Sequence, residues 1–404
     1  MKIAMISVHA SPLAVGVEPQ ETLSVHIAEL ARELGRIGHT VTVYTHRDGR
    51  GSGERVRFAP GVTVEYVSAG DALPMPEQDL LPHIPEFADR LARRWTDDRP
   101  DVIHAHDWLS GLAAISGADG LGIPVVQSFD ELASLEQRAG RRFSAPRVRL
   151  EKAIGRSAHA LVATTGSQRA GLLQLGVPRP RIAVVPSGVD VERFSPRGPA
   201  LPRGASPRIL TVMQPAEWQG VNTLIEALAR IPGAELVVAG GPPRDELDGD
   251  PDIHRLRTTA KKAGVAERVT FLGEVGRAEM PGLMRSADLT VSLSSYETLG
   301  RVPVESMACG TPVVVSAVGG HLDAVIDDVT GIHATPGRPV ELARRIRGLL
   351  AEPTRLAALG IAGMDRVQSR YSWERIADET LKVYETVCAV PEPAAAEPEL
   401  AVAS

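Results

Sequence analysis

Short apolar runs alternate with amphipathic stretches along the first 185 residues. The strand candidates in this part are the runs 3–8, 41–44, 62–67, 102–106, 125–128, 160–163 and 182–185. Between the first two runs, Leu23, Ile27 and Leu30 recur at helical spacing, and Gly35 and Gly38 then end the helix. This alternation is typical of βα units, so it predicts a domain built on a parallel sheet.

The same alternation begins again after a break rich in proline, glycine and serine. The break runs from Pro186 to Pro207, and such a composition predicts a linker. The second set of strand candidates comprises the runs 209–212, 235–239, 269–272, 289–293 and 313–315, with helices expected at 221–231 and 303–309. The pattern therefore predicts two parallel-sheet domains that meet at a hinge.

Helical spacing dominates the chain from Pro339 onward. In the last helix Ile376, Thr380 and Tyr384 recur about once per turn, which predicts a buried face. The residues after Cys388 are small, acidic and proline-bearing, and this composition predicts a disordered tail. The predicted organisation is a first domain at 1–185, a linker at 186–207, a second domain at 208–371, a final helix at 372–388 and a tail at 389–404.

Composition narrows the possible functions. The 404 residues are 43% hydrophobic with a formal net charge of −6, which gives no general reason to expect a nucleic-acid partner. No apolar run has the roughly 18 residues of a membrane span, so membrane association is not expected. Two cysteines far apart, Cys309 and Cys388, indicate a reducing cytoplasmic setting. Metal-ligand spacings, phosphate-binding Walker loops and hydrolase serine elbows are absent from the sequence.

Three segments carry a family resemblance. Residues 101–108 (DVIHAHDW), 184–194 (VVPSGVDVERF) and 297–314 (ETLGRVPVESMACGTPVV) resemble the family-4 glycosyltransferases, in particular the branch of the inositol-phosphate glucosaminyltransferases and sucrose-phosphate synthases. The resemblance runs from residue 1 to about residue 388. It implies an α/β GT-B fold, with two facing Rossmann-like domains, parallel sheets and a C-terminal helix that crosses back to the first domain.

The resemblance also implies a donor site, chiefly in the second domain. A glutamate matching Glu297 contacts the donor sugar, and one matching Glu305 accepts hydrogen bonds from the ribose hydroxyls. A histidine matching His106 reaches a hydroxyl of the donor sugar. A helix that begins just after a glycine also favours a bound phosphate. The backbone positions assigned to this donor site are Leu299, Gly300, Gly319 and Gly320.

The sequence departs from the family where the diphosphate is held. Family members open the first helix with two adjacent glycines, and Glu21 and Thr22 stand there in this chain. Gln214 and Gln219 occupy the positions of an arginine and a lysine. Each lost charge-assisted hydrogen bond is worth roughly 1.5–3 kcal/mol, so donor binding would weaken by about 10²- to 10⁴-fold without compensation.

The acceptor side departs as well. Asp130 stands where the family has a histidine, and in the following 135–138 segment the acidic Glu136 and the neutral Gln137 stand where relatives carry basic residues. His9, at the end of the first strand, is the remaining acceptor-side candidate. These changes make the predicted cleft more acidic, so a phosphate-bearing acceptor is not expected.

Two hypotheses follow. In the first, the chain transfers a sugar from a nucleotide-sugar co-substrate to a small-molecule acceptor by a retaining reaction, without a metal or another cofactor, and Arg301 supplies a replacement cation. The plainer interpretation of Arg301 is a solvent-facing side chain or an i, i+4 partner of Glu305. In the second hypothesis the chain is a non-catalytic homologue that binds a ligand or a partner protein. The oligomeric state is left open.

Overall fold

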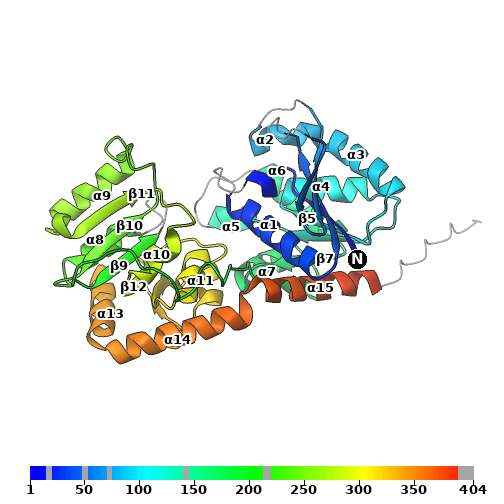
Figure 1. Ribbon diagram of the computed structural model, residues 1–404. Coiled ribbons are helices and arrows are strands. Elements are labelled where there is room, and N and C mark those ends of the chain that lie inside the picture. The colour runs from blue at the N-terminus through cyan, green and yellow to red at the C-terminus, as the bar shows by residue number, and fades with distance from the viewer. Residues whose placement is uncertain are drawn as a thin grey trace, which may run out of the picture.

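The computed structural model describes residues 1–14, 21–47, 53–70, 75–138, 140, 145–212 and 220–389. Two α/β domains lie side by side, each with a central sheet covered by helices (Figure 1). The first contains the strands up to residue 184 and the second contains those from residue 208. The domain limits given above stay a prediction, with which these strand positions agree.

The first domain has an eight-stranded sheet in the order β3-β4-β2-β1-β5-β6-β7-β8. All neighbouring strands are parallel except β3, which pairs antiparallel with β4 at one edge. The strands are β1 Lys2–Ile6, β2 Thr40–His46, β3 Arg55–Ala59, β4 Val62–Val67, β5 Val102–His106, β6 Val125–Ser128, β7 Ala160–Ala163 and β8 Ile182–Val184. The α-helices are α1 Glu21–Arg36, α2 Glu77–Leu80, α3 Ile84–Asp97, α4 Trp108–Gly117, α5 Ala133–Arg138, α6 Ala145–Ser157 and α7 Gly166–Gln174.

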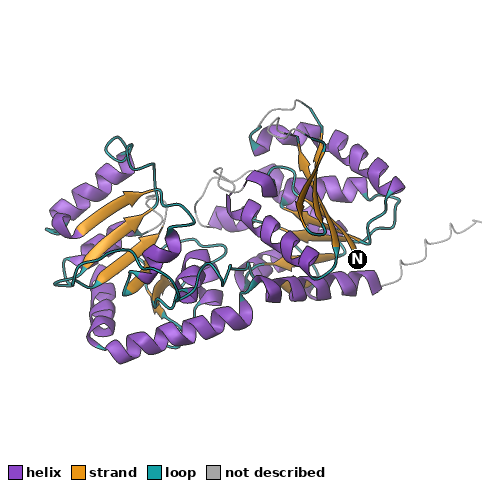
Figure 2. Cartoon of the chain, viewed as in Figure 1, coloured by secondary structure: helices purple, strands orange, loops and turns teal. Residues whose placement is uncertain are grey.

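The second domain has a six-stranded, wholly parallel sheet in the order β11-β10-β9-β12-β13-β14. Its strands are β9 Arg208–Val212, β10 Glu235–Ala239, β11 Val269–Gly273, β12 Leu289–Ser292, β13 Val313–Ser316 and β14 Ile332–Ala334. Its helices are α8 Val221–Leu228, α9 Pro251–Lys262, α10 Met280–Arg285, α11 Arg301–Ala308, α12 Gly319–Ala324, α13 Pro339–Ala351 and α14 Pro353–Arg370. Helices cover both faces of each sheet, as Figure 2 shows.

The last helix, α15 (Trp373–Ala389), returns to the first domain. It runs on from α14 and lies along the first domain beside α1 (Figure 1). Ile376, Tyr384 and Val387 pack in the core that also contains strands β1, β2 and β4. A hydrogen bond of 2.7 Å joins the Tyr384 hydroxyl to Nδ1 of His104 on β5, and both side chains are buried. The crossover helix of the predicted fold is therefore confirmed. It begins and ends one residue later than the expected 372–388.

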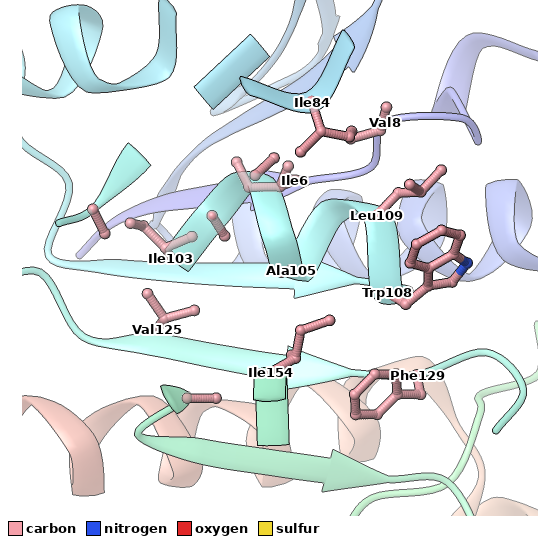
Figure 3. Packing of buried hydrophobic residues seen from close by; sticks show 14 of the residues in the cluster. Ile6, Val8, Ile84, Ile103, Ala105, Trp108, Leu109, Val125, Phe129 and Ile154 are labelled. Atoms are coloured by element: carbon pink, nitrogen blue, oxygen red, sulfur yellow. The ribbon is translucent and has the colours of Figure 1, made fainter. Parts of the chain in front are cut away.

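The predicted strands are recovered, because continuous apolar runs bury both faces of a parallel strand. Residues of the first-domain core, including Ile6, Ile103 and Phe129, pack between the sheet and its helices (Figure 3). The sequence did not predict β3 or β14. Both are short edge strands, and β3 carries exposed and half-buried residues without a buried run.

Two further predictions concern the end of the chain and the membrane. The predicted disordered tail lies outside the described residues from 390 onward. Within the described ranges, helices that combine the length and apolarity needed to cross a bilayer are absent.

Candidate functional site

A cavity of about 260 Å³ lies between the two domains. Residues after β6 and β7 form its first-domain wall, and residues after β12 and β13 form the second-domain wall. Both walls thus come from the carboxyl ends of parallel strands, where open α/β sheets place their ligands. The wall residues include Glu131, Thr165, Glu297, Thr298 and Gly319.

Glu297 lines this cavity from the second domain. Its Oε1 accepts hydrogen bonds from the backbone N–H groups of Leu299, at 3.3 Å, and Gly300, at 3.0 Å. The other oxygen lies 3.7 Å from Nε2 of His321, a fully buried side chain that the sequence analysis missed. Burial lowers the pKa of His321, which favours the neutral ring. The carboxylate of Glu297 is therefore held by the loop that precedes α11.

Three glycines let this loop approach the start of α12. A Cβ on Gly319 would lie 1.9 Å from the carbonyl oxygen of Glu297, and one on Gly320 would lie 2.8 Å from the N of Gly300. Gly300 itself has a φ of 68°, a left-handed conformation that side-chain-bearing residues seldom adopt. The sequence placed these glycines beside a ligand; the structure adds that they hold Glu297 in position.

Glu305 lies one turn into α11 and is buried. Two guanidinium groups approach its Oε1: Nη1 of Arg277 at 3.5 Å and Nε of Arg301 at 3.7 Å. Arg301 also donates a hydrogen bond from Nη1 to Oγ1 of Thr22 in the first domain, at 3.1 Å. Arg301 is thus both the i, i+4 partner of Glu305 and a cation between the domains.

Arg277 escaped the sequence analysis because nothing in its surroundings distinguishes it. It follows β11 in a loop with ordinary turn composition, and the sequence gives no sign that it lies near α11. Its guanidinium also lies over the ring of Phe194, 5.7 Å from the centroid. Only the tertiary fold brings Arg277, Arg301 and Glu305 together.

His106 ends β5 and is 1% exposed. Its Nε2 has no hydrogen-bond partner among the described residues, and the side chain lines a small cavity of about 20 Å³ together with Thr22, Asp107, Asp130 and Leu299. Burial, followed by the neighbouring His104 and His26, lowers its pKa well below the ordinary value. A neutral ring nitrogen with no internal partner therefore faces the space between the domains.

His104, two residues earlier, has a structural role, as predicted. Its Nδ1 and Nε2 are both hydrogen-bonded, to the hydroxyls of Tyr384 and Ser128, each at 2.7 Å. Burial lowers its pKa to about 3, so its ring is neutral. His26 on α1 completes a histidine group that the sequence analysis did not anticipate. Its ring lies 5.8 Å from that of His106, and burial lowers its pKa to about 4.

The acceptor-side candidates His9 and Asp130 lie near Asp107, at the carboxyl ends of β1, β6 and β5. Asp107 is 3% exposed and has a φ of 70° at the N-terminus of α4. Burial raises its pKa to about 7 and that of Asp130 to about 6. Burial lowers the pKa of His9. Glu77, from α2, completes the group, and the sequence gave no indication of its position.

Three predicted site residues are not fully described. Gln214 and Gln219 lie outside the described residues. Glu21 is the first residue of α1, but its side chain is outside the description. The prediction that these residues mark a lost diphosphate site therefore stays a prediction.

This arrangement, with two facing parallel-sheet domains, a cavity between their strand ends and a helix crossing back, defines the GT-B class of glycosyltransferases. Comparison with known proteins agrees with it. Residues 23–193 match the family described as Glycosyltransferase Family 4, and residues 197–366 match Glycosyl transferases group 1.

The chain is 33% identical over 406 residues to the D-inositol 3-phosphate glycosyltransferase of Xylanimonas cellulosilytica, with 95% of this chain and 96% of the relative covered. It is 34% identical over 402 residues to D-inositol 3-phosphate glycosyltransferase 1 of Catenulispora acidiphila, with 95% of each covered. Among solved structures, it resembles the sucrose-phosphate synthase of Thermosynechococcus elongatus with a TM-score of 0.81 and 26% identity, covering 96% of this chain and 98% of that one.

The chain belongs to the family-4 glycosyltransferases, which transfer a sugar from a nucleotide-sugar donor to an acceptor. The fold and family predicted from the sequence are confirmed. The hypothesis of a non-catalytic homologue is not favoured by these comparisons.

Proposed function

We propose that the protein is a retaining hexosyltransferase whose donor diphosphate is bound with the help of Arg301 and Arg277. The observation that carries this proposal is the position of Arg301, which contacts Glu305 in one domain and Thr22 in the other. Thr22 stands at the start of α1, where family members bring bare backbone to the donor phosphates. A guanidinium at this point lies where negative charge must be neutralised.

The remaining donor contacts are assigned by resemblance. Glu305 accepts hydrogen bonds from the ribose hydroxyls, and Glu297 contacts the sugar. Nε2 of His106, which has no hydrogen-bond partner among the described residues, accepts a hydrogen bond from a sugar hydroxyl or donates one to it. Leu299 and Gly300 offer their backbone, although in this structure their N–H groups are bound to Glu297. The donor would therefore compete with the carboxylate of Glu297 for these N–H groups.

The proposed reaction needs no protein nucleophile. The bond between the anomeric carbon and the diphosphate oxygen breaks, and the bond to the acceptor oxygen forms on the same face of the sugar. The acceptor's proton passes to the released phosphate oxygen. The protein would stabilise the charge that develops on this leaving group, and preorganised cations are effective at this.

The acceptor is assigned only as a small molecule. The relatives named above act on an inositol phosphate by name. We infer that this chain takes a different acceptor, because carboxylates gather at the acceptor side of its cleft. A cytoplasmic location is part of the proposal, supported by the free thiols of Cys309 and Cys388.

Calorimetric titration of nucleoside diphosphates and their hexose esters against the full chain tests the donor assignment. Wild type is expected to bind one of them at micromolar concentration, and nuclear magnetic resonance should then show a product with the anomeric configuration of the donor. The comparison protein carries Gln214→Arg and Gln219→Lys. Binding by this variant alone would contradict the proposal, because it would mean that the natural chain lacks a working diphosphate site.

A further inference from the structure

Carboxylates near the carboxyl ends of the first-domain strands form a second group of charges, beside the donor residues. A ring nitrogen of His9 and one carboxylate oxygen each from Glu77 and Asp107 lie within 4.8 Å of one another. Asp130 stands next to Asp107 in the wall of the small interdomain cavity, which His106 also lines. We call His9, Glu77, Asp107 and Asp130 the acidic cluster.

The acidic cluster is short of positive charge. Arg147 on α6 is the guanidinium beside it, but its charge is divided among several acceptors. It lies 2.8 Å from Glu151 and 3.5 Å from Glu136, whereas its distance to Asp107 Oδ1 is 3.9 Å. It also donates a hydrogen bond to the backbone oxygen of Glu131. Glu77 accepts a hydrogen bond from Nε1 of Trp108, so the carboxylate with little compensation is that of Asp107, and this is costly for a buried charge.

Two buried atoms of the acidic cluster also have no hydrogen-bond partner among the described residues: Oδ1 of Asp107 and Nδ1 of His9. Asp107 is only 3% exposed, so water does not compensate freely for the missing bond. Neutral histidine and a carboxylate both offer lone pairs. An unpaired carboxylate oxygen beside a neutral imidazole, which has one lone-pair nitrogen, indicates a ligand that donates hydrogen bonds and carries positive charge.

We infer that the acidic cluster is the acceptor subsite and that it binds a protonated amine on the acceptor. This inference rests on the proposed transferase function and names its acceptor class. The location supports it, because Asp107 and Asp130 share one cavity wall with His106, beside the proposed position of the donor sugar. An acceptor anchored through an ammonium group at the acidic cluster lies next to the site of transfer.

The spacing of these three atoms accommodates an ammonium group. Three atoms no more than 4.8 Å apart have a common point at most 4.8/√3, or about 2.8 Å, from each. A charge-assisted N–H···O bond has a length of about 2.7–2.9 Å. Bonds from protein ligands to zinc, magnesium or calcium are shorter, about 2.0–2.6 Å, and titration with Zn²⁺ and Mg²⁺ decides between the two kinds of ligand. An ammonium nitrogen can therefore be bound by all three residues without movement of their side chains.

The pKa values agree with this assignment. Burial raises the pKa of Asp107 to about 7 and that of Asp130 to about 6, which expresses the cost of charging these buried carboxyl groups. A cation bound beside them removes part of this cost.

The test compares three probes that share a ring: myo-inositol, an inositol in which one hydroxyl is replaced by an amine, and an inositol monophosphate. Each probe is titrated calorimetrically against the full chain, with and without the nucleoside diphosphate that binds in the donor titration. A chelator is present in these titrations to remove metal ions. We expect the amine to bind roughly 10- to 100-fold more tightly than the neutral polyol, as a charged hydrogen bond allows. Equal binding of all three, or preference for the phosphate, overturns the inference.

Variants localise the effect. Asp107→Asn is expected to remove the preference for the amine, whereas the exposed Asp119→Asn keeps it. Glu77→Lys places an ammonium group of the protein in the acidic cluster, so amine binding should be lost and phosphate binding should improve. Amine binding that survives both Asp107→Asn and Glu77→Lys overturns the assignment of the acidic cluster.

Two controls separate this inference from others. Nucleoside diphosphate binding reports on the second domain, so a wild type that binds it but shows no amine preference contradicts the acceptor class and leaves the transferase proposal standing. Zn²⁺ and Mg²⁺ are titrated without chelator. Micromolar binding of either ion to wild type but not to Asp107→Asn would identify a metal site and overturn the ammonium assignment.

Discussion

Arg301 and Thr22 are joined across the interdomain gap by a hydrogen bond of 3.1 Å from the guanidinium Nη1 to the hydroxyl Oγ1. The first belongs to the helix that carries Glu305, and the second belongs to the helix of the first βαβ unit. The contact places a cation at the point where the donor's diphosphate would cross from one domain to the other.

Removal of this cation should weaken donor binding. Arg301→Ala is expected to lower the affinity for the preferred nucleoside diphosphate by roughly 10- to 100-fold, because a charge-assisted hydrogen bond to phosphate is lost. Calorimetry measures the change, and Arg344→Ala, on an exposed position of α13, is the matched control. Thr22→Ala removes the interdomain bond but keeps the charge. If Thr22→Ala and Arg301→Ala lose the same amount of affinity for the nucleoside diphosphate, Arg301 acts by joining the two domains and not by binding phosphate.

The ribose assignment of Glu305 gives a second prediction. Glu305→Gln should lower the affinity for a ribonucleoside diphosphate by about tenfold or more and should abolish the preference over the 2′-deoxy analogue. The reason is that a carboxylate accepts hydrogen bonds from ribose hydroxyls more strongly than an amide does. Glu226→Gln, exposed on α8, should change neither quantity. A variant that binds more weakly but still discriminates the two sugars would place the ribose elsewhere.

The glycine contact behind Glu297 predicts a loss of stability. Gly319→Ala should lower the free energy of unfolding by about 2 kcal/mol or more, because its Cβ would lie 1.9 Å from the carbonyl oxygen of Glu297 at a φ of 43°. Gly337→Ala is the control: its φ of 68° is also left-handed, but nothing lies within 4 Å of the new Cβ. Urea denaturation of both variants separates the effect of the steric clash from that of the backbone strain. Equal losses of unfolding free energy in the two variants would show that the contact between Gly319 and Glu297 contributes nothing to stability.

Asp107 gives a pH-dependent prediction. Burial raises its folded pKa to about 7 from an ordinary 3.8, so between these values the folded chain retains a proton that the unfolded chain has released. Stability from this group is therefore present at low pH and is lost as the pH rises toward 7. The amide introduced by Asp107→Asn cannot titrate, so this variant should gain stability relative to wild type between about pH 4 and about pH 7.

The slope of that gain has an upper limit of about 1.4 kcal/mol per pH unit, the value for a single proton. The lowered pKa of His26 acts in the opposite direction, since it favours stability at higher pH, but it is common to both proteins and cancels in their difference. Urea denaturation over this pH range measures the difference. A difference that is independent of pH would show that Asp107 is ionised throughout.

Much of the fold could be predicted because its signals are local. A buried parallel strand is a short apolar run, and an amphipathic helix shows its spacing within a few turns, so β5, β6 and β7 were located to the residue. The edge strand β3 could not be predicted in this way, because its residues are partly exposed and its only support is β4.

The sequence by itself determined the family, the two parallel-sheet domains and the returning helix, because these depend on contiguous motifs. The same motifs predict roles for Glu297, Glu305 and His106. Tertiary structure alone decided which charges meet. It brought Arg277 to Glu305 and Arg301 to Thr22, and it set His321 behind Glu297. It also gathered Glu77 with Asp107 and His9. The physical reason is that such charges interact over a few ångströms of space, while tens to hundreds of residues separate most of them along the chain.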